Sequence, residues 1–276
     1  MKGLGRAGYT VFEVMIVLAV SISLFFAVAG LLSGKQGKAE TTQAVRDIES
    51  KIQSVANDVT NGYYPSQTSY SCVVATPFVT GSPVSFNATP KAQGTNQGCI
   101  SIGKVMAFDT KDMDIITLVG RQYTGTGSAV GPDVSNITDA HPIAVAQAGG
   151  PDVTENYVYR YDMKVTKMVQ LSDNATSVSA IGFVTQFGGA IGSPSPLSGS
   201  RSVLLYGMSG STPNSNNTAA LATNINVSGS LYPLPDGVRI CFTGGNGQKA
   251  EITVGANGNQ TSTVTAIDNG VNSVCP

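Results

Sequence analysis

The fold is decided by residues 8–32, which read GYTVFE at positions 8–13 and continue as an uncharged run from Val14 to Leu32. At a rise of about 1.5 Å per residue, a helix over these nineteen residues spans about 28 Å, close to the thickness of a bilayer's hydrocarbon core. The sequence therefore predicts a transmembrane helix over residues 14–32.

Glu13 is an acidic side chain at the mouth of this predicted span. A charged side chain costs roughly 2.5 to 3.5 kcal/mol at the centre of a bilayer, so an ionisable residue in such a segment is a functional candidate. The segment itself offers no cation downstream before Lys35. We therefore expect the cationic partner of Glu13 to come from elsewhere.

Gly8, the aromatic Tyr9 and Glu13 stand in fixed register ahead of the apolar helix. This motif resembles the amino-terminal signature of type IV pilins and type II secretion pseudopilins, over about residues 3–60. The resemblance implies that a membrane peptidase cleaves after Gly8 on the cytoplasmic side and methylates the new amino terminus of Tyr9, where the family more usually has Phe. It also implies that Glu13 serves assembly.

The resemblance implies a structural subunit of a type IV pilus or related filament, not an enzyme, and the length and long loops of the chain favour a minor subunit. The implied partners are other pilin subunits, the prepilin peptidase, the pilus assembly machinery and the membrane, with no cofactor and no metal. The chain would cross the cytoplasmic membrane once before assembly, with its carboxy-terminal domain outside, and would belong to an extracellular filament afterwards. Whether that filament is a pilus or a secretion pseudopilus stays open.

Two other interpretations of the same segment also stay open. The sequence AVA at residues 27–29 fits the small-residue cleavage pattern of an ordinary secretory signal peptide. Alternatively, an unprocessed span would anchor an extracellular binding protein or adhesin that forms no filament. A mature amino terminus at methylated Tyr9, at Gly30 or at Met1 would distinguish the three interpretations.

The composition is typical of an exported, β-rich body. Only 12% of the 276 residues are charged, and Trp is absent. Loss of Lys2 and Arg6 with a leader would take the formal net charge from −1 to −3, so we predict no electrostatic attraction to nucleic acid. The same two cations precede the span and place the amino terminus in the cytoplasm by the positive-inside rule, although Lys35 and Lys38 weaken this bias.

The helical pattern continues beyond the span. Glycines at 30, 34 and 37 weaken it by up to about 1 kcal/mol each relative to Ala, so we expect a bend or partial melting there. The dipeptide Asn61-Gly62 stops the helix. We therefore expect a leader over 1–8 and one helix over 9–62. Its second half has an apolar stripe that recurs every three or four residues, at Val45, Ile48, Ile52, Val55 and Val59.

Residues 63–276 predict a β-rich exported domain, so the expected fold class is α+β, with a long helix packed on antiparallel strands. The loops at 124–142 and 188–200 either belong to one body or separate two β modules. Asn-Gly in the connections at 244–247 and 255–258 favours hairpin turns and predicts a carboxy-terminal three-strand meander. The expected strands are Tyr70–Val74, Ile100–Phe108, Ile115–Val119, Tyr157–Tyr161, Lys164–Leu171, Val178–Phe187, Ser202–Met208, Val238–Phe242, Glu251–Val254 and Ser262–Ile267.

Four cysteines, Cys72, Cys99, Cys241 and Cys275, lack the close spacing of zinc or redox sites. They allow three disulfide pairings. We favour Cys72 with Cys99 and Cys241 with Cys275, because each pair closes a local loop and contributes on the order of 3 kcal/mol. Free buried thiols are the alternative.

No arrangement of residues predicts catalysis. His141, the only histidine, stands in an expected loop without flanking ligands, which favours a solvated side chain. Asp109, Asp112 and Asp114 could bind calcium, but they lack the glycine and the terminal glutamate of the twelve-residue calcium loop. A solvated turn is therefore favoured there.

Two further patterns have ordinary explanations. Tyr157, Tyr159 and Tyr161 alternate, which predicts one face of a strand, either for cross-strand packing or as a glycan-binding surface. The glycine clusters near 245 and 256 neither open a helix nor end in Gly-Lys-Ser/Thr, which argues against a phosphate-binding loop. Both patterns favour structure over chemistry.

Overall fold

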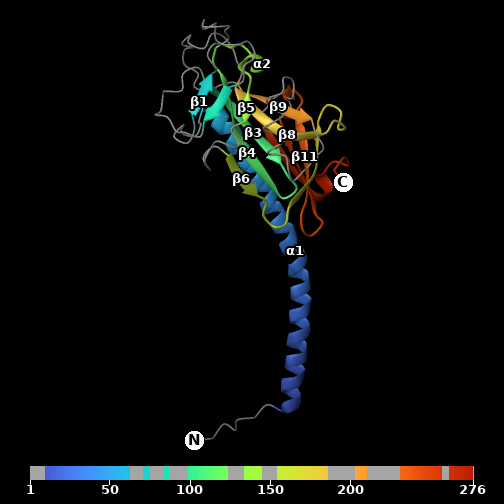
Figure 1. The fold of residues 1–276 in the computed structure, drawn as a ribbon. Coiled ribbons are helices and arrows are strands. Elements are labelled where there is room, and N and C mark those ends of the chain that lie inside the picture. Colours follow the sequence, from blue (N-terminus) through green and yellow to red (C-terminus); the bar gives the residue numbers. More distant parts are fainter. Residues whose placement is uncertain are drawn as a thin grey trace.

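The computed structural model describes residues 10–62, 71–74, 84–87, 99–123, 134–144, 154–185, 203–209, 231–256 and 261–275. A long amino-terminal helix projects from a body of antiparallel sheets (Figure 1). The predicted α+β class, a long helix combined with antiparallel strands, is confirmed. The predicted leader over residues 1–8 lies outside the described residues.

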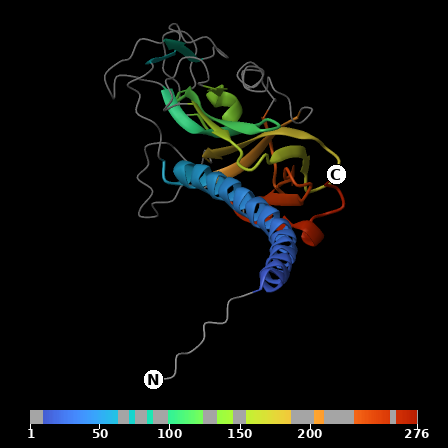
Figure 2. The ribbon, with the colours of Figure 1, turned by 90° about the horizontal axis from the view of Figure 1, so that it is seen from below.

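Helix α1 (Val11–Thr60) is 50 residues long and unbroken. Thr10 caps its start, and at its end the backbone N of Asn61 donates to the carbonyl of Asn57 while Gly62 takes a φ of 67°. The predicted stop is thus confirmed, because glycine adopts this left-handed backbone without strain. The three glycines in the middle of the helix do not melt it, and the helix curves instead (Figure 2).

The second half of α1 is the spine of the body. All five residues of the predicted apolar stripe are buried, with exposed fractions of 2% or less. Full burial of an aliphatic side chain contributes roughly 1.5 to 3 kcal/mol, so the stripe explains why this half packs. Ala44 and Ala56 are also buried, and their small side chains let the helix approach the sheets closely.

The described strands form two larger sheets and one separate pair, and every pairing is antiparallel. The larger sheet has the order β10-β9-β8-β3-β4-β5, with β6 also paired to β4, and the smaller has the order β13-β12-β11-β7. The strands are β1 (Ser71–Val74), β2 (Val84–Asn87), β3 (Cys99–Phe108), β4 (Asp112–Arg121), β5 (Ile143–Ala144), β6 (Thr154–Val158), β7 (Lys164–Gln170), β8 (Val178–Thr185), β9 (Val203–Ser209), β10 (Leu231–Pro233), β11 (Val238–Thr243), β12 (Lys249–Val254) and β13 (Thr263–Ile267). The short elements are the helix α2 (Ile137–Ala140) and the 3-10 turn η3 (Asp268–Gly270).

Helix α1 lies across both sheets (Figure 2). On one side, Nζ of Lys51 donates to Oε1 of Glu155 in β6 at 2.6 Å. On the other side, Nε2 of Gln53 donates to Oγ1 of Thr263 in β13, also at 2.6 Å. One hydrophobic cluster joins the helix to the two larger sheets, so these three parts share a core; it includes Ile48, Ile52, Met106, Phe183, Ile240 and Phe242.

The strand predicted at Tyr157–Tyr161 is wrong in its second half. Strand β6 ends at Val158, and Tyr161 lies in a turn with a φ of 56°. Tyr159 is buried in the core, whereas Tyr161 is exposed and its hydroxyl donates to Oε1 of Gln43 on α1. The three tyrosines therefore do not share one face of a strand, because the turn redirects the chain between the second and the third.

The other predicted strands are present, with ends shifted by a few residues. The three-strand meander is confirmed as β11, β12 and β13, and Gly247 in its first turn has a φ of 79°. Residues 257–260 of its second turn lie outside the described residues. Strands β2, β5 and β10 were not predicted, since segments of four residues or fewer carry little periodic signal.

Candidate functional site

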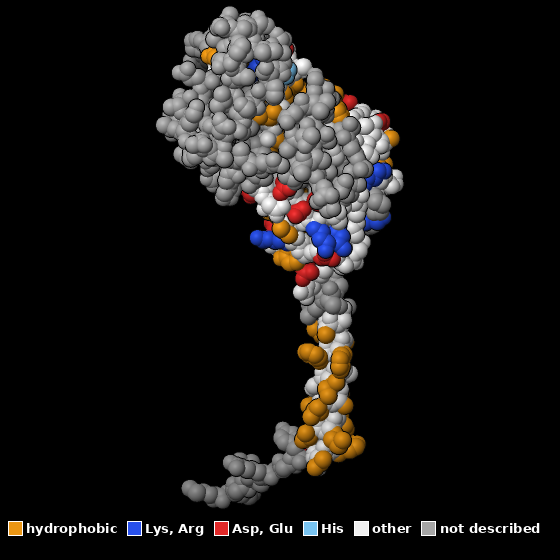
Figure 3. All heavy atoms as spheres, in the orientation of Figure 1, with side chains coloured by type: hydrophobic (Ala, Val, Ile, Leu, Met, Phe, Trp, Pro, Cys, Tyr) orange, Lys and Arg blue, Asp and Glu red, His pale blue; other side chains and the backbone are white. Residues whose placement is uncertain are grey.

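The projecting half of α1 carries the largest apolar surface of the described chain. Every residue from Thr10 to Gly30 is exposed, and most of them are apolar. Among the described residues, α1 is the one helix long and apolar enough to cross a membrane. Figure 3 shows hydrophobic side chains along this half and charged side chains gathered where the helix enters the body. An apolar surface of this kind indicates contact with lipid or with other apolar helices.

Glu13 begins this half as part of a capping box. Its backbone N donates to Oγ1 of Thr10 at 3.3 Å, and its Oε2 accepts from N and Oγ1 of Thr10 at 3.1 and 3.2 Å. The carboxylate therefore satisfies a donor at the helix start and stands at the positive end of the helix dipole. Our sequence interpretation sought a cation and missed this neutral partner, although the T-x-x-E spacing at 10–13 is a readable signal.

The two carboxylate oxygens of Glu13 differ in their described contacts. Within the part of the chain that the structure describes, Oε1 accepts no hydrogen bond. Gly8 and Tyr9, predicted for cleavage and methylation, lie outside the described residues. The site can therefore hold a carboxylate with one oxygen fixed by the cap and the other available to a cation. The carboxylate borders a shallow apolar groove with Val14, Val17, Leu18 and Ser21.

The neck, which we define as α1 from Lys35 to Asp47, is where the helix enters the body. Lys35, Lys38 and Arg46 line an open groove along it. Nζ of Lys38 lies 3.1 Å from Oδ2 of Asp268, with side-chain exposures of 61% and 26%. A pair this exposed contributes little stability, so the charges mark the border between the apolar half and the body without fixing the helix.

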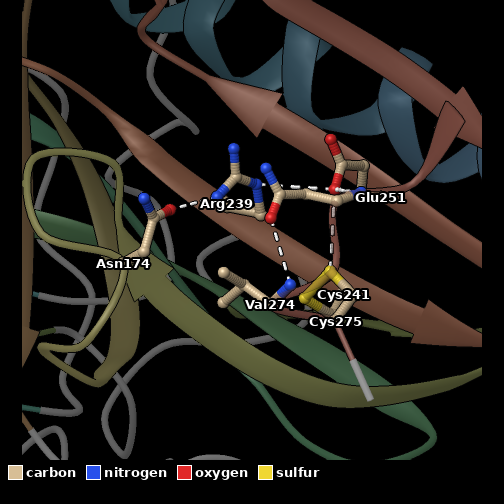
Figure 4. A network of polar contacts seen from close by, with 7 residues as sticks. Asn174, Arg239, Cys241, Glu251, Val274 and Cys275 are labelled. Carbon is tan, nitrogen blue, oxygen red and sulfur yellow. Dashed lines mark hydrogen bonds and ion pairs between the residues drawn. A yellow bond between two sulfur atoms is a disulfide. The ribbon is translucent and has the colours of Figure 1, made fainter.

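The carboxy-terminal tail is fastened to the smaller sheet by a disulfide (Figure 4). Cys241 in β11 and Cys275 are bonded, as predicted, with their Cα atoms 5.4 Å apart. Sγ of Cys275 lies 3.7 Å from Oε2 of Glu251 in β12. The side chains of the other predicted pair, Cys72 and Cys99, lie outside the described residues, so that pairing stays a prediction.

The aspartates considered for calcium have local partners. Asp112 and Asp114 in β4 both accept from Nδ2 of Asn156, at 3.3 and 2.8 Å. Asp109 lies in the β3–β4 turn, where its Oδ1 accepts from the backbone N of Thr110. No group of three His, Cys, Asp or Glu residues able to hold a metal ion occurs among the described residues.

His141 and Tyr159 have pKa values shifted by packing. His141 follows α2 with a φ of 46° and is half-buried, so it is less solvated than predicted. Burial and, next, the Arg121 guanidinium lower the pKa of His141, opposed by Asp139. Burial raises the pKa of Tyr159 well above its ordinary value. The neighbouring carboxylates of Asp112, Asp109 and Asp114 raise it further.

The features that indicate a function are the projecting apolar half of α1, the capped carboxylate of Glu13 and the neck. Comparison of the chain with protein-family models, with curated proteins and with solved structures found no match. The function is therefore inferred from these features and from the motif at positions 8–13.

Proposed function

We propose that this protein is a structural subunit, of the minor kind, of a type IV pilus or related filament, assembled through α1 after cleavage behind Gly8. The observation that carries the proposal is one unbroken helix that is exposed and apolar in its first half and the spine of the core in its second. A membrane tether needs no such continuity, since a flexible linker would serve. A filament subunit benefits from a continuous helix, because packing of the apolar halves then also positions the body of each subunit.

Before assembly, lipid surrounds the apolar half of α1. In the filament, the apolar halves of neighbouring subunits take the place of the lipid. In lipid no hydrophobic driving force holds apolar helices together, so apolar contacts alone favour one axial register only weakly. A charge pair discriminates well, since the alternative is an unpaired charge in an apolar medium. In this proposal, the amine of Tyr9 in one subunit meets Oε1 of Glu13 in its neighbour.

The body lies outside the cytoplasm in this proposal. The disulfide between Cys241 and Cys275 supports that placement, because disulfides persist mainly in oxidising compartments. The partners are then the membrane, the prepilin peptidase, the assembly machinery and other subunits. A membrane-anchored binding protein that forms no filament is the competing function.

The test is the mature amino terminus, determined by mass spectrometry of the protein purified from its host membranes. A methylated amino terminus at Tyr9 is the expected result. A start at Gly30 would indicate a signal peptide, and a start at Met1 an unprocessed anchor; either would contradict the proposal.

A pair of glycine variants sharpens this test. Gly8→Val should stay at full length, because the peptidase must approach the backbone closely at that residue. Gly5→Val makes the same change three residues upstream and should be processed normally. Normal maturation of Gly8→Val would count against the assignment.

A further inference from the structure

The turn between β11 and β12, residues 244–248, is packed against α1 at the neck. Among the residues of α1 whose burial is described, Gly37 is the first from the amino-terminal end that is partly buried. A Cβ atom at Gly37 would lie 2.5 Å from Nδ2 of Asn246, closer than real Cβ contacts. A side chain at residue 37 would therefore have to displace the side-chain amide of Asn246.

Asn246 is held in place by two groups. Its Oδ1 accepts from the backbone N of Gln248 at 3.1 Å and lies 3.4 Å from Oγ1 of Thr41. Thr41 is 3% exposed, and its hydroxyl also lies 3.1 Å from the carbonyl of Gly37. The asparagine side chain thus cannot swing aside without losing these contacts.

The other glycines of the turn leave room for two neighbouring segments, α1 and the β6–β7 turn. A Cβ at Gly244 would lie 2.8 Å from Oγ1 of Thr41, and one at Gly245 would lie 3.2 Å from Cβ of Asp162 in the β6–β7 turn. Gly247 has a φ of 79°, which L side chains rarely adopt. The glycine-rich sequence at 244–247 therefore serves close packing as well as the hairpin itself.

The projecting half has no comparable support among the described residues. Gly30 has nothing within 4 Å of its would-be Cβ, and the ion pair of Lys38 with Asp268 is largely exposed. Glycines just ahead of the neck also weaken the helix. The direction of the projecting half therefore depends on how firmly the neck is held.

We propose that Asn246 is a positioning residue: its packing on Gly37 and Thr41 fixes the direction in which α1 leaves the body. The role of this contact in filament assembly rests on the proposed function. The contact itself does not, because it concerns the geometry of a single chain.

The test measures the helix direction in the full chain in detergent micelles. Spin labels are attached to unnatural residues that replace Ser21 in the projecting half and Val264 in β13. Pulsed electron paramagnetic resonance then gives the distribution of distances between the two labels. Gly37→Leu and Asn246→Ala should each broaden that distribution by a factor of about two, because the projecting half then samples several directions. Gly30→Leu is the matched control and should leave the width unchanged. Asn246→Ser retains a side-chain acceptor for Gln248 and should stay nearer the parent.

Two outcomes would overturn the proposal: a parent-like width in Gly37→Leu or in Asn246→Ala. Thermal unfolding of the body should differ little between Asn246→Ala and the parent, which separates positioning from a general loss of structure. Incorporation into filaments is scored separately. If the distances change as expected but the parent forms no filament, the proposed function fails while the role of Asn246 stands.

Discussion

Nε of Arg239 in β11 lies 3.4 Å from Oε2 of Glu251 in β12, and the side chains are only 11% and 10% exposed (Figure 4). Nε makes no hydrogen bond to any described residue, so its contact with Glu251 is an ion pair, while another guanidinium nitrogen donates to Asn174. The same carboxylate oxygen accepts from the backbone N of Asn272 at 2.8 Å. One buried charge thus connects two strands to the carboxy-terminal tail.

Arg239→Met should lower the free energy of unfolding by about 3 kcal/mol or more, because it leaves the Glu251 carboxylate buried without its cation. Adding Glu251→Gln should recover part of that loss, since the amide still has an oxygen for Asn272. Urea unfolding followed by tyrosine fluorescence measures both. Lys111→Met is the control: its pair with Asp162 is exposed, and its loss should be below about 1 kcal/mol. Equal losses for Arg239→Met and the control would contradict the buried-pair explanation.

Replacing Cys241 and Cys275 together by Ala should destabilise the body by about 4 kcal/mol, because their bond closes a loop with a sequence separation of 34. The measurement is the urea midpoint of parent and variant, with and without reducing agent. Reduction should lower the midpoint of the parent more than that of the double variant. Peptide mapping without reduction should recover the two cysteine peptides together, and finding Cys72 joined to Cys275 would contradict the structure.

Glu13→Ala should leave cleavage behind Gly8 intact and reduce incorporation into filaments, with Glu13→Asp intermediate because of its shorter reach. Thr10→Ala separates the two roles of this carboxylate. It removes the cap, worth about 1 kcal/mol, and keeps the charge. Quantitative immunoblots of sheared filaments should therefore show a milder defect for Thr10→Ala than for Glu13→Ala. Equal defects would mean that capping, not charge pairing, is what assembly requires.

Acid should destabilise the body through His141. Its pKa is lowered in the folded chain, whereas the unfolded chain has the ordinary value of about 6.5. The stabilisation from the neutral imidazole is present in full above pH 6.5 and is lost as the pH falls through the lower folded value. His141→Asn keeps a residue that tolerates the φ of 46° and should flatten the pH dependence of the unfolding free energy between about pH 7 and 5. Identical slopes for parent and variant would exclude this histidine as the cause.

Features set by local sequence could be predicted. The stripe that includes Ile48 and Ile52 repeats with the helical period, and Asn61-Gly62 ends the helix through its own backbone preferences. The capping box of Thr10 and Glu13 is equally local and could have been predicted from its spacing. The pairing of Cys241 with Cys275 was predicted correctly because it closes a local loop and ties the carboxy-terminal tail to a strand.

Features set by strand pairing could not be predicted. The partnership of β3 with β8 and of β11 with β7 joins segments far apart in the chain, and no single-strand pattern specifies it. Arg239 and Glu251 approach each other only through the β11–β12 register. The packing of Asn246 on Gly37 likewise requires knowing where a distant turn meets the helix. Sequence therefore predicted the elements, and the contacts between them needed the structure.

The unbroken helix also makes the projecting half a lever. Glu13 lies 24 residues from Gly37, which is about 36 Å along α1, so a tilt of about 10° at the neck would carry its carboxylate sideways by about 6 Å. That displacement exceeds the reach of an ion pair, about 4 Å. In a subunit that assembles as proposed, small motions at a surface turn are thus amplified at the far end of the helix, where they decide whether two charges can meet.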